Sequence, residues 1–429
     1  MPSLHGWTSI EVAFGSTAIG VIVGRAQLKQ FLQFPWIAIL ALLMALILWH
    51  LATWVLPIHL GDTSSEILGD AFSALVGMWF GRNSALIGRP GPNHKRGTLL
   101  GSAITRLSSM KSRTSNRLTL AGLAVYPEDE TKHFKLIGTT GTGKSTAIRE
   151  LLERALERGD RAVIADPDFS YADRFYDPTR GDVILNPFDS RAARWDLFAE
   201  MTTLYDADQL ARSLIVDTEG TERPWRNYAR VFLISLLRQL HRVKHDDVGE
   251  LYKFLSVTPI DDLRELLADT PAGPYLTQDN GKFFGAVRAV ANTHLAALEP
   301  IALQSARDRI SVRGWVRRGQ GTTTPGVLFL PYRANEIASL RSIISTWMRL
   351  AIFEAMGRPE GDQKLWFVID ELDALGAIDG LKDALARLRK FGGRCVLGFQ
   401  SIAQVSGTYG HAEAQTIVEN CGNTLILRC

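Results

Sequence analysis

Cysteine is scarce in this sequence and confined to its last part, at Cys395, Cys421 and Cys429. No two of them form a C-x-x-C pair, the spacing that zinc sites and dithiol redox sites share. An odd number of late cysteines also gives no disulfide framework of the kind that holds small secreted domains together. We therefore interpret them as buried or incidental thiols of a protein in a reducing compartment. Tandem repeats and low-complexity tracts are also missing from the sequence.

The sequence has no strong excess of charge of one sign, since 48 Lys and Arg against 45 Asp and Glu leave a formal net charge of +3. That balance is too small to predict a nucleic-acid partner from charge alone. The 429 residues, 46% of them hydrophobic and 22% charged, permit two or three packed domains and exclude a disordered chain. The averages hide a division, because the apolar residues crowd the first 80 positions and the remainder has the composition of a soluble protein.

One long apolar run, residues 34–60 (FPWIAILALLMALILWHLATWVLPIHL), contains no Asp, Glu, Lys or Arg. As a helix rising about 1.5 Å per residue it is long enough to cross a hydrocarbon core of roughly 30 Å. Trp36, Trp49 and Trp54 suit anchoring near the membrane interfaces. The run is too long, and too far from the first residue, for a cleaved signal peptide. We predict a transmembrane anchor in residues 1–82, with 34–60 as its main span.

Two weaker apolar stretches, residues 9–24 and 66–81, flank this span and leave two topologies open. In the first, 34–60 and 66–81 form a hairpin, and 9–24 is a further span or an interfacial helix. In the second, 9–24 pairs with 34–60, which places Arg25 and Lys29 outside. Both put the rest of the chain in the cytoplasm, so we predict a multi-pass membrane anchor with a cytoplasmic body.

An acid-free basic segment follows the anchor and favours this orientation. It has no Asp or Glu before Glu128, and its basic residues are Arg82, Arg89, Lys95, Arg96, Arg106, Lys111, Arg113 and Arg117. By the positive-inside rule such a segment is cytoplasmic. It faces either the lipid surface or a nucleic acid, and the residues themselves leave both interpretations open.

A phosphate-binding loop follows the predicted strand 134–137. The pattern G-x-x-x-x-G-K-[ST] is matched by Gly138, Gly143, Lys144 and Ser145, and it opens a helix with apolar residues at helical spacing. The loop amides and the helix N-terminus are expected to face phosphates, Lys144 to reach the outer ones, and Ser145 to offer its hydroxyl to Mg²⁺. The predicted ATP-binding residues are Gly138, Thr139, Thr140, Gly141, Thr142, Gly143, Lys144, Ser145 and Thr146.

A second strand, 365–369, ends in Asp370 and Glu371. Hydrolysis needs a carboxylate on the metal side and a group that activates water, so we predict Asp370 in the Mg²⁺ shell and Glu371 as general base. A third buried strand within 394–401 ends in Gln400, whose amide could sense the γ-phosphate or orient water. Between these strands lies a helix whose end carries Arg387, Arg389 and Lys390. In a ring ATPase an arginine there could reach the nucleotide of a neighbouring subunit.

The chain between Lys144 and Asp370 is far longer than a compact P-loop core needs. Residues 161–168, 181–189 and 326–333 have the pattern of core strands, whereas 196–318 has helical periodicity with short Gly, Pro and Asp breaks. We predict an α/β fold in which a RecA-like P-loop ATPase domain, residues 83–195 and 319–429, carries an inserted all-α domain, residues 196–318.

This arrangement resembles the type IV secretion coupling proteins, the conjugative TraD/TrwB group of membrane-anchored ATPases related to FtsK and HerA. The resemblance covers residues from about 118 onward and rests on GTTGTGKST, VIADPD, VILNPFD before the all-α insertion, LWFVIDELDAL, and GFQS followed by IAQVSGTYG. It implies a homo-hexameric ring that binds DNA without reading its sequence and pumps relaxase-bound DNA to a secretion channel with ATP and Mg²⁺. It also implies that Arg389 acts in trans, with Lys390 as the competing residue, and that Gln400 acts in catalysis.

The family pattern differs from this chain in one respect. Family members continue past the strand NTLILRC, whereas this sequence stops at Cys429. We therefore expect a nucleotide domain truncated at its C-terminus, with the active-site residues present.

Three other functions compete with a coupling ATPase. A chromosome-segregating FtsK/HerA-like translocase would be expected to carry a longer anchor and linker, and the all-α insertion argues against it. A transporter ATPase would be expected to show an LSGGQ-like signature, which is missing. An inactive scaffold that only binds secretion partners fits the early end of the chain but not its intact Lys144, Asp370, Glu371 and Gln400.

Overall fold

The computed structural model describes residues 117–217, 220–305, 308–318, 326–357 and 364–428. The predicted anchor and the basic segment up to Arg113 lie outside these residues. Within the described ranges, no helix combines the length and the apolar character that crossing a bilayer requires.

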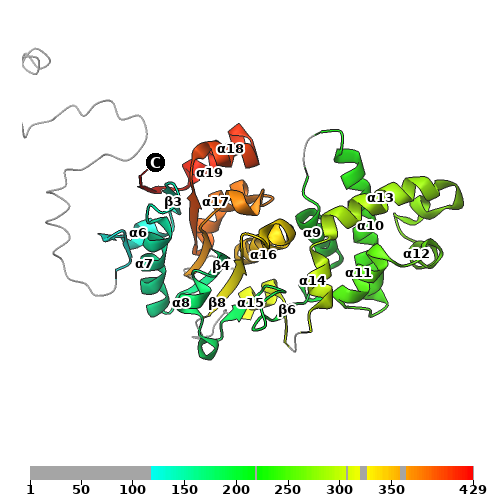
Figure 1. Cartoon of the computed structure of the whole chain (residues 1–429), viewed down its shortest axis with the longest axis horizontal. Helices are drawn as coiled ribbons and strands as arrows, with labels where there is room; N and C mark the ends of the chain where they lie inside the picture. The colour runs from blue at the N-terminus through cyan, green and yellow to red at the C-terminus, as the bar shows by residue number, and fades with distance from the viewer. Residues whose placement is uncertain (1–116, 218–219, 306–307, 319–325, 358–363, 429) are drawn as a thin grey trace, which may run out of the picture. The chain divides into compact units, whose positions relative to one another are not determined.

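A seven-stranded sheet in which every described pairing is parallel forms the centre of the described chain (Figure 1). Its order is β11 (Asn423–Ile426), β3 (Phe134–Ile137), β10 (Gly393–Phe399), β9 (Leu365–Ile369), β4 (Arg161–Pro167), β8 (Val327–Tyr332) and β5 (Val183–Ile184). Two small two-stranded sheets pair β1 (Thr119–Leu120) with β2 (Leu123–Ala124), and β6 (Arg194–Trp195) with β7 (Arg309–Ile310).

The predicted α/β architecture with a parallel sheet is thereby confirmed, with one correction. Residues 181–189 were expected to form a core strand, but β5 has only two residues and lies at the edge of the sheet. The reason is that the chain leaves the ladder at Asn186, whose Nδ2 donates to the carbonyl of Pro331 at 3.0 Å.

Helices cover both faces of the sheet and fill the long connection between β6 and β7. On or beside the sheet lie α6 (Pro127–Glu130), α7 (Lys144–Glu157), α8 (Ala172–Phe175), α15 (Val312–Arg318), α16 (Ile337–Met356), α17 (Leu381–Leu388), α18 (Ile402–Tyr409) and α19 (His411–Asn420). Between β6 and β7 lie α9 (Leu204–Leu214), α10 (Arg223–Arg242), α11 (Val248–Ser256), α12 (Ile260–Leu267), α13 (Gly281–Leu295) and α14 (Leu298–Leu303).

The alternation of side chains along the strands explains why both faces are covered. On β9, Trp366 and Val368 belong to the core beneath α7, whereas Phe367 and Ile369 belong to the core shared with α16 and α17. Successive strand residues point to opposite faces, so a strand that is apolar throughout needs helices on both sides.

The connection between β6 and β7 enters its first helix through a capping box. Thr203 precedes α9, and the carboxylate of Asp206 accepts from the backbone N–H of Thr203 at 2.7 Å. Such a box satisfies two of the donors that a helix start leaves free. In Figure 1, α10 to α13 lie beyond α9 and α14 as seen from the sheet. β6 and β7 pair with each other where the chain leaves toward these helices and returns.

The sheet register determines which residues meet at the carboxyl ends of the strands. Phe399 pairs with Ile137, Leu397 with Ile369, and Ala165 with Ile369. The residues that follow β3, β10, β9 and β4 therefore gather at one edge, the position at which open parallel sheets bind ligands.

Candidate active site at the carboxyl edge of the sheet

The loop between β3 and α7 requires glycine at three positions. A Cβ on Gly138 would lie 2.7 Å from Thr142 Oγ1 and 2.9 Å from Leu427 Cβ, so a larger residue would collide with the loop. Gly141 and Gly143 have φ angles of +80° and +96°, which side chains disfavour. Gly143 also precedes α7 directly, so its conformation turns the chain from the loop into the helix.

The four threonines of the loop and of the first turn of α7 have different contacts. Thr142 Oγ1 donates to Thr139 O at 2.8 Å, and Thr139 Oγ1 donates to Arg428 O at 3.2 Å. Thr140 Oγ1 accepts from Gln400 Nε2 at 3.5 Å, and Thr146 Oγ1 accepts from Arg149. Lys144 Nζ donates to Gly138 O at 3.3 Å, so its side chain lies back over the loop that it is predicted to complete around phosphates.

Ser145 and Asp370 lie together, as expected for a magnesium site. Ser145 Oγ donates to Asp370 Oδ2 at 2.6 Å, although Ser145 lies in the first turn of α7 and Asp370 directly follows β9. Asp370 Oδ1 is buried and has no hydrogen-bond partner among the described residues. A hydroxyl that retains its lone pairs and a carboxylate oxygen without a partner are the oxygen donors that Mg²⁺ prefers, so these two residues fit the metal.

Gln400 lies next to Glu371. Its Nε2 is 3.4 Å from Glu371 Oε1, and it also contacts the phosphate-binding loop through Thr140. Burial raises the pKa of Glu371, with a further contribution from the neighbouring carboxylate of Asp373 and an opposing one from Lys144. A carboxylate that is partly desolvated and held by an amide is a suitable proton acceptor from water.

β10 passes close to the end of β9 only because residue 398 is glycine. A Cβ on Gly398 would lie 2.1 Å from the carbonyl oxygen of Asp370. The same close approach allows Leu372 N to donate to Gly398 O at 2.9 Å. Gly398 therefore helps to place Asp370 and Gln400 side by side.

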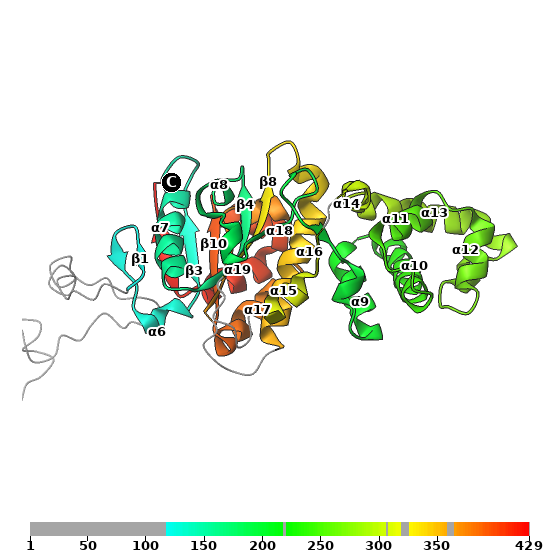
Figure 2. The same ribbon diagram turned by 90° about the horizontal axis from the view of Figure 1, so that it is seen from below.

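Arg389 lies at the opposite end of the strands from the phosphate-binding loop. It follows α17 and precedes β10, so it stands where the strands begin, whereas the phosphate-binding loop stands where they end (Figure 2). The side chains of Arg387, Arg389 and Lys390 are all exposed. The sheet thus separates Arg389 from the phosphate-binding loop of its own chain.

His133 ties α17 to the sheet near these basic residues. Cys395 N donates to its Nδ1 at 3.1 Å, so the ring proton lies on Nε2, which is 2.9 Å from Leu385 O. Burial lowers the pKa of His133 to about 4, and the nearby Arg389 and Arg394 act in the same direction. The imidazole is therefore neutral at pH 7.

We expect this histidine to make the described domain less stable in weak acid. Because its pKa is about 4 in the folded protein and 6.5 in the reference state, the unfolded chain binds more protons between these values. Stability is then lost as the pH falls from 6.5 to 4, by about 3 kcal/mol from this group. This loss is measured from the thermal midpoints of wild type and His133→Gln between pH 4 and pH 7.5. The variant should have the lower midpoint at pH 7.5, but its midpoint should fall less than that of wild type as the pH is lowered. Thermal midpoints that fall equally in both proteins would contradict this interpretation.

With this geometry in view, similarity to known proteins identifies the family. The sequence model of the type IV secretion-system coupling protein DNA-binding domain matches residues 117–429. The chain belongs to this family. TraD of Escherichia coli K12, a coupling protein, is 30% identical over 311 residues, which are 72% of this chain and 43% of TraD. A conjugal transfer protein TraG of Escherichia coli is 25% identical over 280 residues, or 57% of this chain and 42% of TraG. The chain thus spans less than half the length of these two relatives.

Solved structures of a bacterial conjugative coupling protein have the same fold. TrwBdeltaN70 in an unbound form gives a TM-score of 0.67 at 32% identity and covers 78% of this chain and 77% of its own. TrwB in complex with ADP and Mg²⁺ gives a TM-score of 0.67 at 31% identity, covering 78% of each chain. The predicted membership of the TraD/TrwB family is therefore confirmed.

Three buried residues of this coupling-protein fold at the carboxyl edge were not predicted from the sequence. Asp166, Tyr171 and Tyr332 all lie beside the end of β9. Burial raises the pKa of Asp166 to about 7, against the opposing effect of hydrogen bonds from Ala172 and Tyr171. The motif VIADPD held a signal for Asp166, since an acidic residue ends a buried apolar run near the end of β4, but no sequence pattern indicates the two tyrosines.

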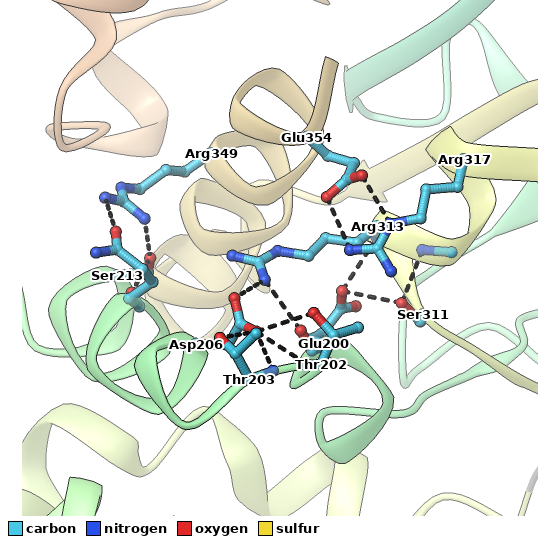
Figure 3. Close-up of polar contacts among 12 residues, drawn as sticks. Glu200, Thr202, Thr203, Asp206, Ser213, Ser311, Arg313, Arg317, Arg349 and Glu354 are labelled. Atoms are coloured by element: carbon cyan, nitrogen blue, oxygen red, sulfur yellow. Dashed lines mark hydrogen bonds and ion pairs between the residues drawn. The ribbon is translucent and has the colours of Figure 1, made fainter. Parts of the chain in front are cut away.

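A buried polar cluster joins α9 to α15, the helix that follows β7 (Figure 3). The Glu200 carboxylate, which is 0% exposed, accepts from Ser311 Oγ and from the backbone N–H groups of Val312 and Arg313 at the start of α15. The guanidinium of Arg313 donates to Asp206 on α9 and to Glu200 O. Removing one partner from a buried charge is costly, so these hydrogen bonds hold α9 and α15 in one arrangement.

A second guanidinium, that of Arg349 on α16, bridges two segments. Nη1 donates to Ser213 Oγ at 2.9 Å and Nη2 to Gln209 Oε1 at 3.0 Å, both on α9. Its Nε donates to the carbonyl of Asp379 at 3.1 Å, in the segment between Glu371 and α17. Arg349 therefore connects α9 with the segment that leads from the predicted general base to Arg389.

Proposed function

We propose that this chain is the ATPase of a conjugative type IV secretion system that recruits and pumps relaxase-bound DNA to the secretion channel. One observation carries the proposal: the Ser145–Asp370 contact joins the phosphate-binding loop to a strand end that also bears Glu371, with Gln400 beside it. Membership of the coupling-protein family supports the DNA and secretion partners, and the TrwB complex with ADP and Mg²⁺ supports the cofactors ATP and Mg²⁺.

In the proposed mechanism, the loop amides and Lys144 bind the phosphates of ATP. Mg²⁺ held by Ser145 and Asp370 supplies positive charge to the phosphate oxygens when it is bound. Glu371 accepts a proton from the attacking water, and the Gln400 amide, within hydrogen-bond distance of its Oε1, holds that carboxylate toward the phosphate-binding loop.

The proposed assembly is a homo-hexameric ring on the bacterial inner membrane, with residues 1–82 as anchor. Residues 83–195 and 319–429 form the nucleotide domain, and residues 196–318 form the inserted all-α domain. Arg389 of one subunit reaches the nucleotide of its neighbour, which its position away from its own phosphate-binding loop supports. DNA phosphates bind without sequence readout, so affinity should fall steeply as salt rises.

DNA-stimulated ATP hydrolysis by the full chain tests this proposal. Wild type should hydrolyse ATP faster when single- or double-stranded DNA is added, and Lys144→Ala should be inactive because its phosphate contacts are lost. Hydrolysis that is indifferent to DNA would reject the motor, and nucleotide binding without hydrolysis would favour a scaffold that only binds secretion partners.

We also expect Arg349 to couple α9 of the inserted domain to the segment after Glu371 when DNA binds, because its guanidinium contacts both. Arg349→Lys keeps the charge but cannot donate to α9 and to Asp379 together, since an ammonium group lacks the planar fork. DNA stimulation of hydrolysis should fall about fivefold, whereas hydrolysis without DNA should change little.

Arg317→Lys is the matched control for that experiment. Its guanidinium pairs with Glu354 at 2.7 Å, so the same substitution affects only α15 and α16 (Figure 3). Equal loss of stimulation in both variants, or a loss of basal activity that matches the loss of stimulation in Arg349→Lys, would show that Arg349 has only a structural role.

A further inference from the structure

The turn after β4 has a strained backbone next to the candidate magnesium site. Asp168 and Phe169 have φ angles of +53° and +60°, and neither is glycine. Two successive non-glycine residues in the left-handed region are uncommon, and such strain persists only where the surroundings hold it in place. The hydrogen bonds that stabilise this turn therefore indicate which side chain the turn holds in place.

The buried carboxylate of Asp166 accepts the hydrogen bonds that stabilise this turn. Its side chain is 0% exposed, and its two carboxylate oxygens accept from Tyr171 N at 3.0 Å and from Ala172 N at 2.7 Å. Ser170 Oγ donates to the same carboxylate at 3.3 Å. One buried carboxylate thus closes the turn from the end of β4 to the first residue of α8.

The residue positioned by this turn is Tyr171. It is 0% exposed, and its hydroxyl donates to Asp370 Oδ2 at 2.9 Å. Ser145 Oγ donates to the same oxygen at 2.6 Å, while Asp370 Oδ1 has no partner among the described residues. Both donors therefore act on one carboxylate oxygen and leave the other for a cation or its water.

A buried tyrosine hydroxyl usually has a hydrogen-bond partner, and a backbone carbonyl would serve as one. Here the partner is the ionisable carboxylate that faces the P-loop serine. Hydrogen bonds from the surroundings orient metal-ligating carboxylates, and losing one weakens metal binding about 10- to 100-fold in known sites. A hydroxyl fixed by a strained turn is well suited to this role because it is held in place before the ligand arrives.

We propose that Tyr171 is a positioning residue of the nucleotide site, which holds the Asp370 carboxylate in the orientation that binds Mg²⁺ with the nucleotide. Asp166 acts indirectly, because its carboxylate stabilises the turn that carries Tyr171. This inference rests on the proposed function, because it concerns the same nucleotide site.

The test is calorimetric titration of ADP into the full chain, with Mg²⁺ and with EDTA. In wild type, Mg²⁺ should strengthen ADP binding. In Tyr171→Phe, the strengthening by Mg²⁺ should be about tenfold smaller, whereas the affinity in EDTA should stay within about twofold of wild type. Asp166→Asn should reduce the same strengthening, because asparagine cannot accept from both backbone N–H groups.

Tyr176→Phe is the matched control, since Tyr176 lies on the same segment but packs its ring against Phe329. It should bind ADP like wild type under both conditions. A Tyr171→Phe variant that folds with an unchanged thermal midpoint and keeps the full strengthening by Mg²⁺ would overturn the inference. An equal loss with Mg²⁺ and with EDTA would assign Tyr171 to the shape of the pocket and also overturn it.

The same experiment separates this inference from the proposed function. Wild-type protein that binds no ADP under either condition would reject the nucleotide site itself. Wild-type protein that binds ADP equally with and without Mg²⁺ would reject only the positioning role.

Discussion

Replacing Glu371 with glutamine is expected to lower kcat for ATP by about 100-fold to 10,000-fold, because the amide cannot accept a proton from water. Glutamine has the same shape as glutamate, and among the hydrogen bonds of the described residues Glu371 is linked to the phosphate-binding loop through the Gln400 amide. Nucleotide affinity should therefore stay near that of wild type. Single-turnover hydrolysis together with equilibrium ATP binding measures both quantities.

The matched control for this variant is Lys144→Ala, which should lose nucleotide binding as well as hydrolysis. The contrast separates a residue of the chemical step from a residue of binding. If Glu371→Gln hydrolyses ATP at the wild-type rate, another group activates the water, and Glu371 is not the general base. If it loses affinity in proportion to activity, its role is in binding.

Replacing Arg389 with alanine is expected to lower DNA-stimulated hydrolysis by about 1,000-fold to 100,000-fold, the range that arginine fingers contribute in related phosphoryl-transfer enzymes. The physical reason is the charge that develops on the γ-phosphate as its bond to ADP breaks. Because Arg389 stands at the opposite end of the strands from its own phosphate-binding loop, we expect the loss to arise at the proposed interface between subunits.

Mixtures of subunits test the action in trans. Adding Arg389→Ala subunits to wild type should reduce hydrolysis more steeply than the wild-type fraction falls, since each variant subunit disables its neighbour. Lys390→Ala is the matched control, because Lys390 is the next residue and is also exposed. A simple proportional decline would argue against the role in trans, and a loss confined to Lys390→Ala would transfer that role to Lys390.

The strands of the nucleotide domain were predictable because their signal is local. The runs ending at Ile137 and Ile369 are strands with the expected bounds, β3 and β9. Each is a short apolar run that stops at a glycine loop or an acidic residue, so pattern and position agree. Residues 181–189 misled the prediction, because their apolar run is followed by an asparagine that bonds to β8 and ends the pairing.

The location of Arg389 followed from topology and not from its own neighbours in the sequence. Once β9 and β10 are parallel, the helix between them must return the chain to the edge where strands begin. The residue type alone predicted only that Arg389 places a positive charge at the end of a helix. The parallel pairing places that charge at the opposite end of the strands from the phosphate-binding loop of the same chain.

The sequence by itself determined the family, the phosphate-binding loop and the identity of the acidic pair, because each depends on residues that are close together in the chain. Only the tertiary structure decided that Tyr171 donates to Asp370, that His133 is neutral, and that Arg349 connects α9 with the segment after Glu371. These contacts join residues that are far apart in the chain, and they depend on strand register and helix packing. Parallel strands are joined by long crossover connections, so the residues that meet across them are distant in the sequence.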